Sequence, residues 1–166
     1  MKKPAADHPR PPLKGTDVVA LAVATGFGTG YAPVASGTFG TLVGIPAALL
    51  VAQLDAWWLQ LLTIAAFCAV AMLAAARAAR ALGAREDGHT VSNEIAGYLV
   101  TMALVPISLK TVVAGFFLFR IFDILKPWPA SYFDRKVHTG IGNVMDDVCA
   151  AFYARACMAL LLWLWP

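Results

Sequence analysis

The chain has 166 residues, of which 60% are hydrophobic and 14% are charged, so it is too apolar for an ordinary soluble domain. The formal net charge is +3 and the basic residues are scattered, which gives little support for a nucleic-acid partner. Cys68, Cys149 and Cys157 each lie in an apolar run, as buried apolar side chains do, and their odd number argues against a disulfide framework.

The first residues of the chain are rich in proline and in Lys and Arg. This composition predicts that residues 1–15 form a disordered cytoplasmic tail. No signal peptide is expected, because no continuous apolar segment follows the basic residues. Residues 16–166 are then expected to form a single membrane-embedded domain. Thr16 or Asp17 can cap its first short helix, over residues 18–24.

Glycines alternate with Ser and Thr in residues 25–46, which read TGFGTGYAPVASGTFGTLVGIP. Such a segment lets backbone N–H groups approach an anion, and a helix that begins near Thr38 would add the positive end of its dipole. The segment therefore predicts a phosphate site at Ser36, Gly37 and Thr38. The alternative is that the glycines only allow helices to pack closely in a membrane.

Apolar runs of helical length then follow one another. The run over residues 56–76 is about one bilayer thickness long as a helix, and the cluster of Arg77, Arg80 and Arg85 after it marks the cytoplasmic side. Counting helices from there places the glycine-rich segment, residues 86–94 and residues 120–147 on that same side. The sequence thus predicts an all-α integral membrane bundle of about five hydrophobic helices, with polar loops and the functional site on the cytoplasmic side. The runs are 39–54, 56–76, 95–105, 111–118 and 148–165.

A dense group of charges interrupts the apolar sequence between Phe119 and Asp147, which read FRIFDILKPWPASYFDRKVHTGIGNVMDD. Charge this dense between two hydrophobic runs is costly at membrane depth and points to function. Carboxylates gathered on one face repel one another unless a cation joins them, and a set with no Cys or His quartet suits a hard cation such as Mg2+. The acidic candidates are Glu94, Asp123, Asp134, Asp146 and Asp147.

Each acidic residue also has a purely structural interpretation. Glu94 would be favoured in the first turn of a helix by the helix dipole, and Asp123 has Arg120 and Lys126 three residues away on either side. Asp146 and Asp147 could cap the last helix. Asp134 could pair with a neighbouring base, Arg135 or Lys136.

The basic residues of the stretch are candidates for binding phosphate oxygens. Arg120, Lys126, Arg135 and Lys136 are the cations available for this role, and the prolines after Lys126 stiffen the chain there. His138 could act as a general acid or base, although a single His in a loop is more often only solvated.

The charged stretch, with GFGTGYAPVASGTFGTLVGIP and NEIAGY upstream, resembles the phosphatidylglycerophosphatase A family over roughly residues 26–151. Proteins of that family are Mg2+-dependent membrane phosphatases that convert phosphatidylglycerophosphate to phosphatidylglycerol. The resemblance implies the same reaction here, on an anionic phospholipid, in the cytoplasmic membrane of a bacterium with the site facing the cytoplasm.

On this hypothesis the site residues have three roles. Direct attack by water and a phospho-aspartate on Asp123 both stay open, because no sequence feature marks a nucleophile. The catalytic candidates are Asp123, Asp147, Lys126 and His138; the Mg2+ ligands are Asn93, Glu94, Asp123, Asp146 and Asp147; the phosphate-binding candidates are Ser36, Gly37, Thr38, Arg120, Lys126 and Arg135.

The chain departs from the family pattern at two places. The family usually has Asp-Glu where this chain has Asn93-Glu94, and Asn keeps an oxygen ligand but loses the charge, which should weaken Mg2+ binding. The family also commonly has Pro before Gly-Thr, where this chain has Ser36. That second change leaves the backbone amides in place.

A small membrane transporter or channel subunit is the alternative function. It would place acidic residues at mid-depth in several spans, whereas the acids here mostly lie at the ends of the apolar runs, which favours an enzyme. The sequence leaves open whether the protein forms homo-oligomers.

Overall fold

The computed structural model describes residues 13–82 and 89–164. Within them the chain is all-α, with no strand, as the apolar runs predicted. The expectations for residues 1–12, Arg85, residues 86–88 and Trp165 lie outside the described residues. The elements are α1 (Gly15–Ala24), the 3-10 helix η1 (Thr29–Tyr31), α2 (Ser36–Val51), α3 (Trp57–Leu82), α4 (Ser92–Thr101), α5 (Leu109–Leu125), α6 (Ala130–Lys136) and α7 (Gly140–Leu164).

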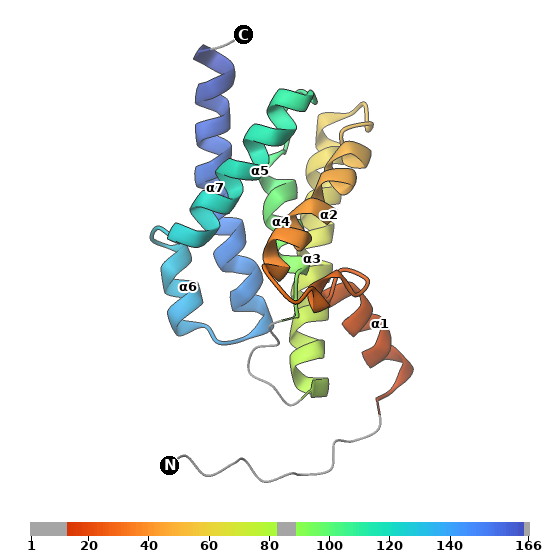
Figure 1. Ribbon diagram of the computed structural model, residues 1–166. Helices are drawn as coiled ribbons and strands as arrows, with labels where there is room; N and C mark the ends of the chain where they lie inside the picture. The colour runs from red at the N-terminus through yellow and green to blue at the C-terminus, as the bar shows by residue number, and fades with distance from the viewer. Residues whose placement is uncertain (1–12, 83–88, 165–166) are drawn as a thin grey trace.

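Helix α4 is the centre of the molecule. It packs against α2, α3, α5 and α7, which enclose it (Figure 1). A helix that is apolar on all sides needs such an enclosure, and Tyr98 and Leu99 of α4 join Phe119 of α5 and Met158 of α7 in the main apolar core. The first turn of α4 is therefore held in place by four neighbouring helices.

Two glycines of α2 permit its close approach to α4. A Cβ atom on Gly40 would lie 2.8 Å from Cβ of Val91, and one on Gly44 would lie 3.0 Å from Cδ1 of Tyr98. The packing interpretation of the glycine-rich segment is thus confirmed at these two residues.

Two helices, α3 and α7, are long and apolar enough to cross a membrane by their length and composition. At 16 and 17 residues, α2 and α5 are shorter, and α4 has only 10 residues, which corresponds to about 15 Å of helix. The all-α prediction is confirmed, whereas a bundle of five spanning helices is not established.

The helix boundaries correct several expectations. Helix α7 begins at Gly140 and not near Val148, so the prediction that Asp146 and Asp147 cap it is wrong; both lie in its second turn and are buried. Helix α5 continues beyond residue 118 to Leu125, so Asp123 lies within a helix, as its interpretation as part of an intrahelical salt bridge required. The longer helices result from tertiary packing, which outweighs the local preference of charged residues for loops.

Helix α1 also begins earlier than predicted. It starts at Gly15 with Lys14 as its N-cap residue, so neither Thr16 nor Asp17 caps it as expected. Instead the Asp17 carboxylate accepts the Lys14 N–H and pairs with Arg77 Nε of α3 at 2.8 Å. Arg77 therefore fixes α1 to the end of α3 that carries the arginines.

The two ends of the bundle are distinct. A cavity of about 680 Å3 is lined both by Gln53, between α2 and α3, and by Pro106, between α4 and α5. These two turns therefore lie at one end. At the other end the start of α7 touches α3, because a Cβ on Gly140 would lie 2.2 Å from N of Ala76.

Candidate active site

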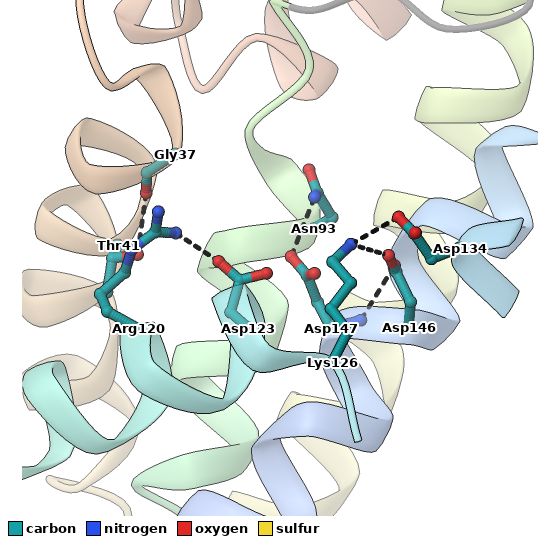
Figure 2. Close-up of polar contacts among 9 residues, drawn as sticks. All are labelled: Gly37, Thr41, Asn93, Arg120, Asp123, Lys126, Asp134, Asp146 and Asp147. Carbon is teal, nitrogen blue, oxygen red and sulfur yellow. Dashed lines mark hydrogen bonds and ion pairs between the residues drawn. The ribbon is translucent and has the colours of Figure 1, made fainter. Parts of the chain in front are cut away.

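Polar side chains from α4, α5 and α7 meet where the first turn of α4 lies against the last turns of α5 and the second turn of α7 (Figure 2). Asp123 of α5 and Asp147 of α7 point toward each other there. Gly97 allows this approach, since a Cβ on it would lie 2.4 Å from the ring of Phe119 and 3.2 Å from the carbonyl oxygen of Asp147. Asp147 is only 1% exposed. A carboxylate buried this deeply requires compensation.

Cationic side chains lie on both flanks of the pair. Arg120 donates from Nη1 to Oδ2 of Asp123, so the predicted salt bridge within the helix is confirmed on that side. Lys126 does not pair with Asp123; its Nζ donates to Asp146 Oδ2, and to Asp134 Oδ1 at 2.9 Å. Asp134 thus pairs with Lys126, and the expected pairing with Arg135 or Lys136 is wrong.

Lys126 reaches Asp146 because of its place at the end of α5. It is the C-cap residue, in the left-handed conformation with φ 44° and ψ 62°, and its N–H donates to the carbonyl of Phe122 at 2.8 Å. Burial acts to lower the pKa of Lys126, but the hydrogen bond and the charge of Asp146 outweigh burial and raise it. The ammonium is therefore charged at neutral pH.

Adjacent residues of α7 serve different partners. Asp146 faces Lys126, whereas Asp147 accepts a hydrogen bond from Asn93 Nδ2 at its Oδ2, 2.9 Å away. This separation agrees with the angle of about 100° between successive side chains on a helix. The N–H of Asp147 also donates to Asp146 Oδ1 at 3.0 Å.

Glu94 completes the cluster from the first turn of α4. Burial is the main cause that raises the pKa of its carboxyl group to about 8; the backbone N–H of Glu94 opposes this shift, the Asp123 charge adds to it, and Arg120 opposes it. Oε2 of Glu94 and Oδ1 of Asn93 are buried and have no hydrogen-bond partner among the described residues. Such orphaned oxygens are rare in folded proteins and require an explanation.

The first turn of α2 reaches the same cluster. A Cβ on Gly37 would lie 2.6 Å from Oε1 of Glu94 and 3.0 Å from Nη1 of Arg120, so only glycine fits there without displacing the two side chains. The N-cap residue Ala35 has φ 53°, and no side chain caps the helix. Ser36 and Thr38 flank Gly37 and are half-buried. The three predicted segments therefore do meet at one place.

Other predicted residues lie outside this cluster. Arg135 is in the last turn of α6 and His138 in the loop that follows; both are exposed. Sequence reasoning missed Tyr153, whose hydroxyl donates to the carbonyl oxygen of Trp128 at 2.6 Å and so holds the segment after Lys126 against α7. Nothing in the apolar sequence around Tyr153 signals this role.

The cavity at the opposite end of the bundle does not compete as a site. Its lining consists of apolar residues with Gln53 and Gln60. None of these side chains is ionisable, so the cavity offers no group for acid–base or metal chemistry.

The chemistry of the cluster fits a hard divalent cation. Carboxylate and amide oxygens are the ligands that Mg2+ prefers, the carboxylates outnumber the cations of the cluster, and two of its oxygens have no partner. In the conformation described, however, no three His, Cys, Asp or Glu side chains of residues 13–82 and 89–164 are arranged to hold an ion. An ion would require Lys126 or Arg120 to release its carboxylate.

Comparison with known proteins gives a consistent result. The family model "Phosphatidylglycerophosphatase A" matches residues 22–162. Phosphatidylglycerophosphatase A of Escherichia coli K12 is 34% identical over 145 residues, which is 87% of this chain and 84% of that protein. The protein of the same name from Haemophilus influenzae is 35% identical over 133 residues, 80% of this chain and 82% of that protein.

A third relative has a different name. It comes from Bacteroides thetaiotaomicron, its name proposes phosphatidylinositol-3-phosphatase activity, and it is 31% identical over 160 residues, 91% of this chain and 98% of its own length. No solved structure matches the chain.

Proposed function

This chain belongs to the phosphatidylglycerophosphatase A family, and we propose that the carboxylate cluster of α4, α5 and α7 is where it hydrolyses phosphatidylglycerophosphate. The protein is thus a lipid phosphatase of phospholipid synthesis. The observation that carries the assignment of the site is the meeting of the buried Asp123–Asp147 pair, Arg120 and Gly37 at one point.

Arg120 and Lys126 are the groups that would hold the phosphate. Each is now paired with a carboxylate, Asp123 and Asp146 respectively, and each can exchange it for a phosphate oxygen, because both partners are anionic. Their charges would then stabilise the negative charge that develops on those oxygens during transfer. The backbone at Gly37, at the positive end of α2, would support the same oxygens.

Mg2+ is the proposed cofactor. Asp123, Asp146, Asp147 and Glu94, with Oδ1 of Asn93, would hold it, and when bound it would neutralise phosphate charge and favour ionisation of a water molecule. The buried oxygens of Asn93 and Glu94 that have no partner support this set.

Asp147 is the residue that we propose as the base. Its carboxylate is buried and accepts a hydrogen bond from Asn93, which fixes its position. It can therefore accept the proton of an attacking water while Arg120 and Lys126 bind phosphate. Attack by Asp123 itself is the alternative, and it predicts an acyl phosphate in acid-quenched enzyme. His138 as an acid or base stays a prediction, as does phosphate binding by Arg135, Ser36 and Thr38.

We also propose that the chain crosses the membrane several times with the site on the cytoplasmic side. Helices α3 and α7 are candidate spans. Helix α7 begins at the end of the bundle that holds the site, and there it touches α3 at Ala76, next to Arg77. Arg80 lies in the last turn of α3. Basic residues beside a span favour the cytoplasmic side, which supports this orientation.

Phosphate release from phosphatidylglycerophosphate in detergent tests the proposal. We expect release with Mg2+, none with EDTA, and a loss of about 100-fold or more in Asp123→Asn, because the variant loses a charge in the reacting cluster. Asp55→Asn, at the other end of the bundle, is the matched control and should keep full activity. Folded protein that releases phosphate equally well in EDTA would contradict the Mg2+ proposal, and an active Asp123→Asn variant would contradict the site.

A further inference from the structure

Helix α5 has two faces of opposite character. Leu109, Val113, Phe117, Ile121 and Leu125 follow one another at intervals of four residues and are all exposed. Asp123 lies on the packed side of the helix and Arg120 at the border between the two faces, and both side chains are largely covered, at 11% and 19% exposed. Apart from Lys110 in its first turn, α5 covers its charged side chains and exposes apolar ones, an arrangement suited to a lipid environment and not to water.

Helix α2 repeats this pattern. Its glycines Gly40 and Gly44 face α4, whereas Phe39, Leu42 and Leu49 are exposed. Helices α2 and α5 pack against each other as well as against α4, and Figure 1 shows both on the same side of α4. Two helices that contact each other therefore both carry a stripe of exposed apolar side chains.

Positive charge lies where the two stripes reach the site. The guanidinium of Arg120 on α5 lies beside Gly37 of α2, at the helix end where the dipole is positive. Phe117, which is exposed, lies three residues before Arg120 and is therefore its neighbour on the surface of α5. A molecule that joins a phosphate to apolar chains complements both features at once, since its charge and its chains face matching surfaces.

We propose that the phospholipid substrate reaches the site sideways from the bilayer, between α2 and α5. Its phosphate lies at Arg120 and the first turn of α2, and its acyl chains lie along Phe39 and Leu42 of α2 and Phe117 and Ile121 of α5. This inference rests on the proposed function, which it extends from the head group to the acyl chains.

The kinetic test compares two matched pairs of substitutions. The first double variant, Phe117→Ser with Ile121→Ser, alters two side chains of the proposed path that are 60% and 49% exposed. The second, Leu160→Ser with Leu161→Ser, alters two side chains of α7 that are similarly exposed, at 54% and 42%. For a long-chain substrate we expect the first pair to raise KM about fivefold with little change in kcat, since apolar contact to the chains is lost. The second pair should leave both constants unchanged.

A short-chain, water-soluble substrate separates this inference from the proposed function. The Phe117 and Ile121 variant should hydrolyse dihexanoyl phosphatidylglycerophosphate as well as the unaltered protein does. Unaltered protein that hydrolyses neither lipid would contradict the proposed function. An unchanged long-chain KM in a variant that remains active would overturn the sideways path alone.

Photolabelling decides the question without turnover or substitution. Long-chain phosphatidylglycerophosphate with a diazirine on one acyl chain should label α2 and α5 peptides selectively, and excess unlabelled substrate should prevent this. Phosphatidylcholine with the same diazirine chain should label all lipid-facing helices without that selectivity. Equal labelling of α3 and α7 by the phosphatidylglycerophosphate probe, or labelling of α2 and α5 that excess substrate does not reduce, would overturn the proposal.

Discussion

Asn93 shows how one residue sets the charge balance of the site. Its Nδ2 donates to Asp147, while its Oδ1 is buried and has no hydrogen-bond partner within residues 13–82 and 89–164. An amide can satisfy a buried carboxylate in this way without a metal ion. A carboxylate at the same position would instead face Asp147 directly, and two such groups repel unless a cation joins them.

Asn93→Asp should therefore make the fold more dependent on Mg2+. In EDTA we expect a stability loss of about 1–3 kcal/mol, because a hydrogen bond to a charged group is replaced by like-charge repulsion. Adding Mg2+ should raise Tm more in the variant than in the unaltered protein, by linkage to binding. Thermal denaturation in detergent with each additive measures this.

Gln53→Glu, in the turn between α2 and α3 at the opposite end of the bundle, is the control for adding one acidic residue away from the site. It should show the same Mg2+ response as the unaltered protein. An equal Tm gain from Mg2+ in all three proteins would mean that Asn93 is not part of a cation site.

Gly37→Ala tests the close approach of α2 to the site. The added Cβ would meet Oε1 of Glu94 at 2.6 Å and Arg120 at 3.0 Å, both flexible side-chain ends, so we expect the two groups to move with little loss of Tm. Activity should fall about tenfold or more, since catalytic groups displaced by about 1 Å lose much of their effect. The measurement is kcat/KM beside Tm.

Gly15→Ala on α1 supplies the matched control, because a Cβ there meets nothing within 4 Å. This variant should change neither kcat/KM nor Tm. Full activity in Gly37→Ala would show that Glu94 and Arg120 can move without consequence, and so would remove Gly37 from the site.

At the scale of the helices, α4 holds the site together although it is one of the shortest. It is enclosed on all sides, and its residue Gly97 lies against Phe119 of α5 and the backbone of α7 at Asp147. The distance between Asp123 and Asp147 depends on this contact, because Asp123 belongs to α5 and Asp147 to α7, and both helices pack against Gly97.

Gly97→Ala should destabilise the fold by about 1–3 kcal/mol through overpacking against the Phe119 ring. A smaller side chain should relieve the clash, so Gly97→Ala combined with Phe119→Leu should be more stable than the sum of the two single changes predicts. Denaturation of all four proteins of the cycle measures the coupling. Strict additivity would show that the two residues do not press on each other.

At the scale of the molecule, the two ends of the bundle differ in chemistry. The carboxylate cluster and the arginines of α3 share one end, while the turns at Gln53 and Pro106 share the other. The proposed multi-pass topology would place these two ends in different compartments.

Cysteine labelling in vesicles tests that orientation. A variant without the native cysteines would receive one cysteine at Tyr132 of α6 or at Gln53. We expect an impermeant maleimide to label position 132 only in inverted vesicles and position 53 only in right-side-out vesicles, because positively charged segments stay cytoplasmic. Labelling of both positions from the same side would contradict a chain that separates two compartments.

The sequence by itself determined the helical class, the polar stretch and its acidic and basic members. Apolar runs dictate buried or lipid-facing helices whatever their partners are, and the motif around Asp123 and Lys126 is local. The family resemblance rested on such local segments, and the comparisons confirm it.

Only the tertiary structure decided which side chains face each other. Lys126 meets Asp146 and not Asp123, and Asn93 meets Asp147 across 54 residues of sequence. Gly37 lies against the charged ends of Glu94 and Arg120, whereas Gly40, three residues later, lies against Val91 and the Cβ of Glu94. Spacing along the chain fixes contacts within one helix. Contacts between helices depend instead on how closely α4 is enclosed, and that results from packing around the whole molecule.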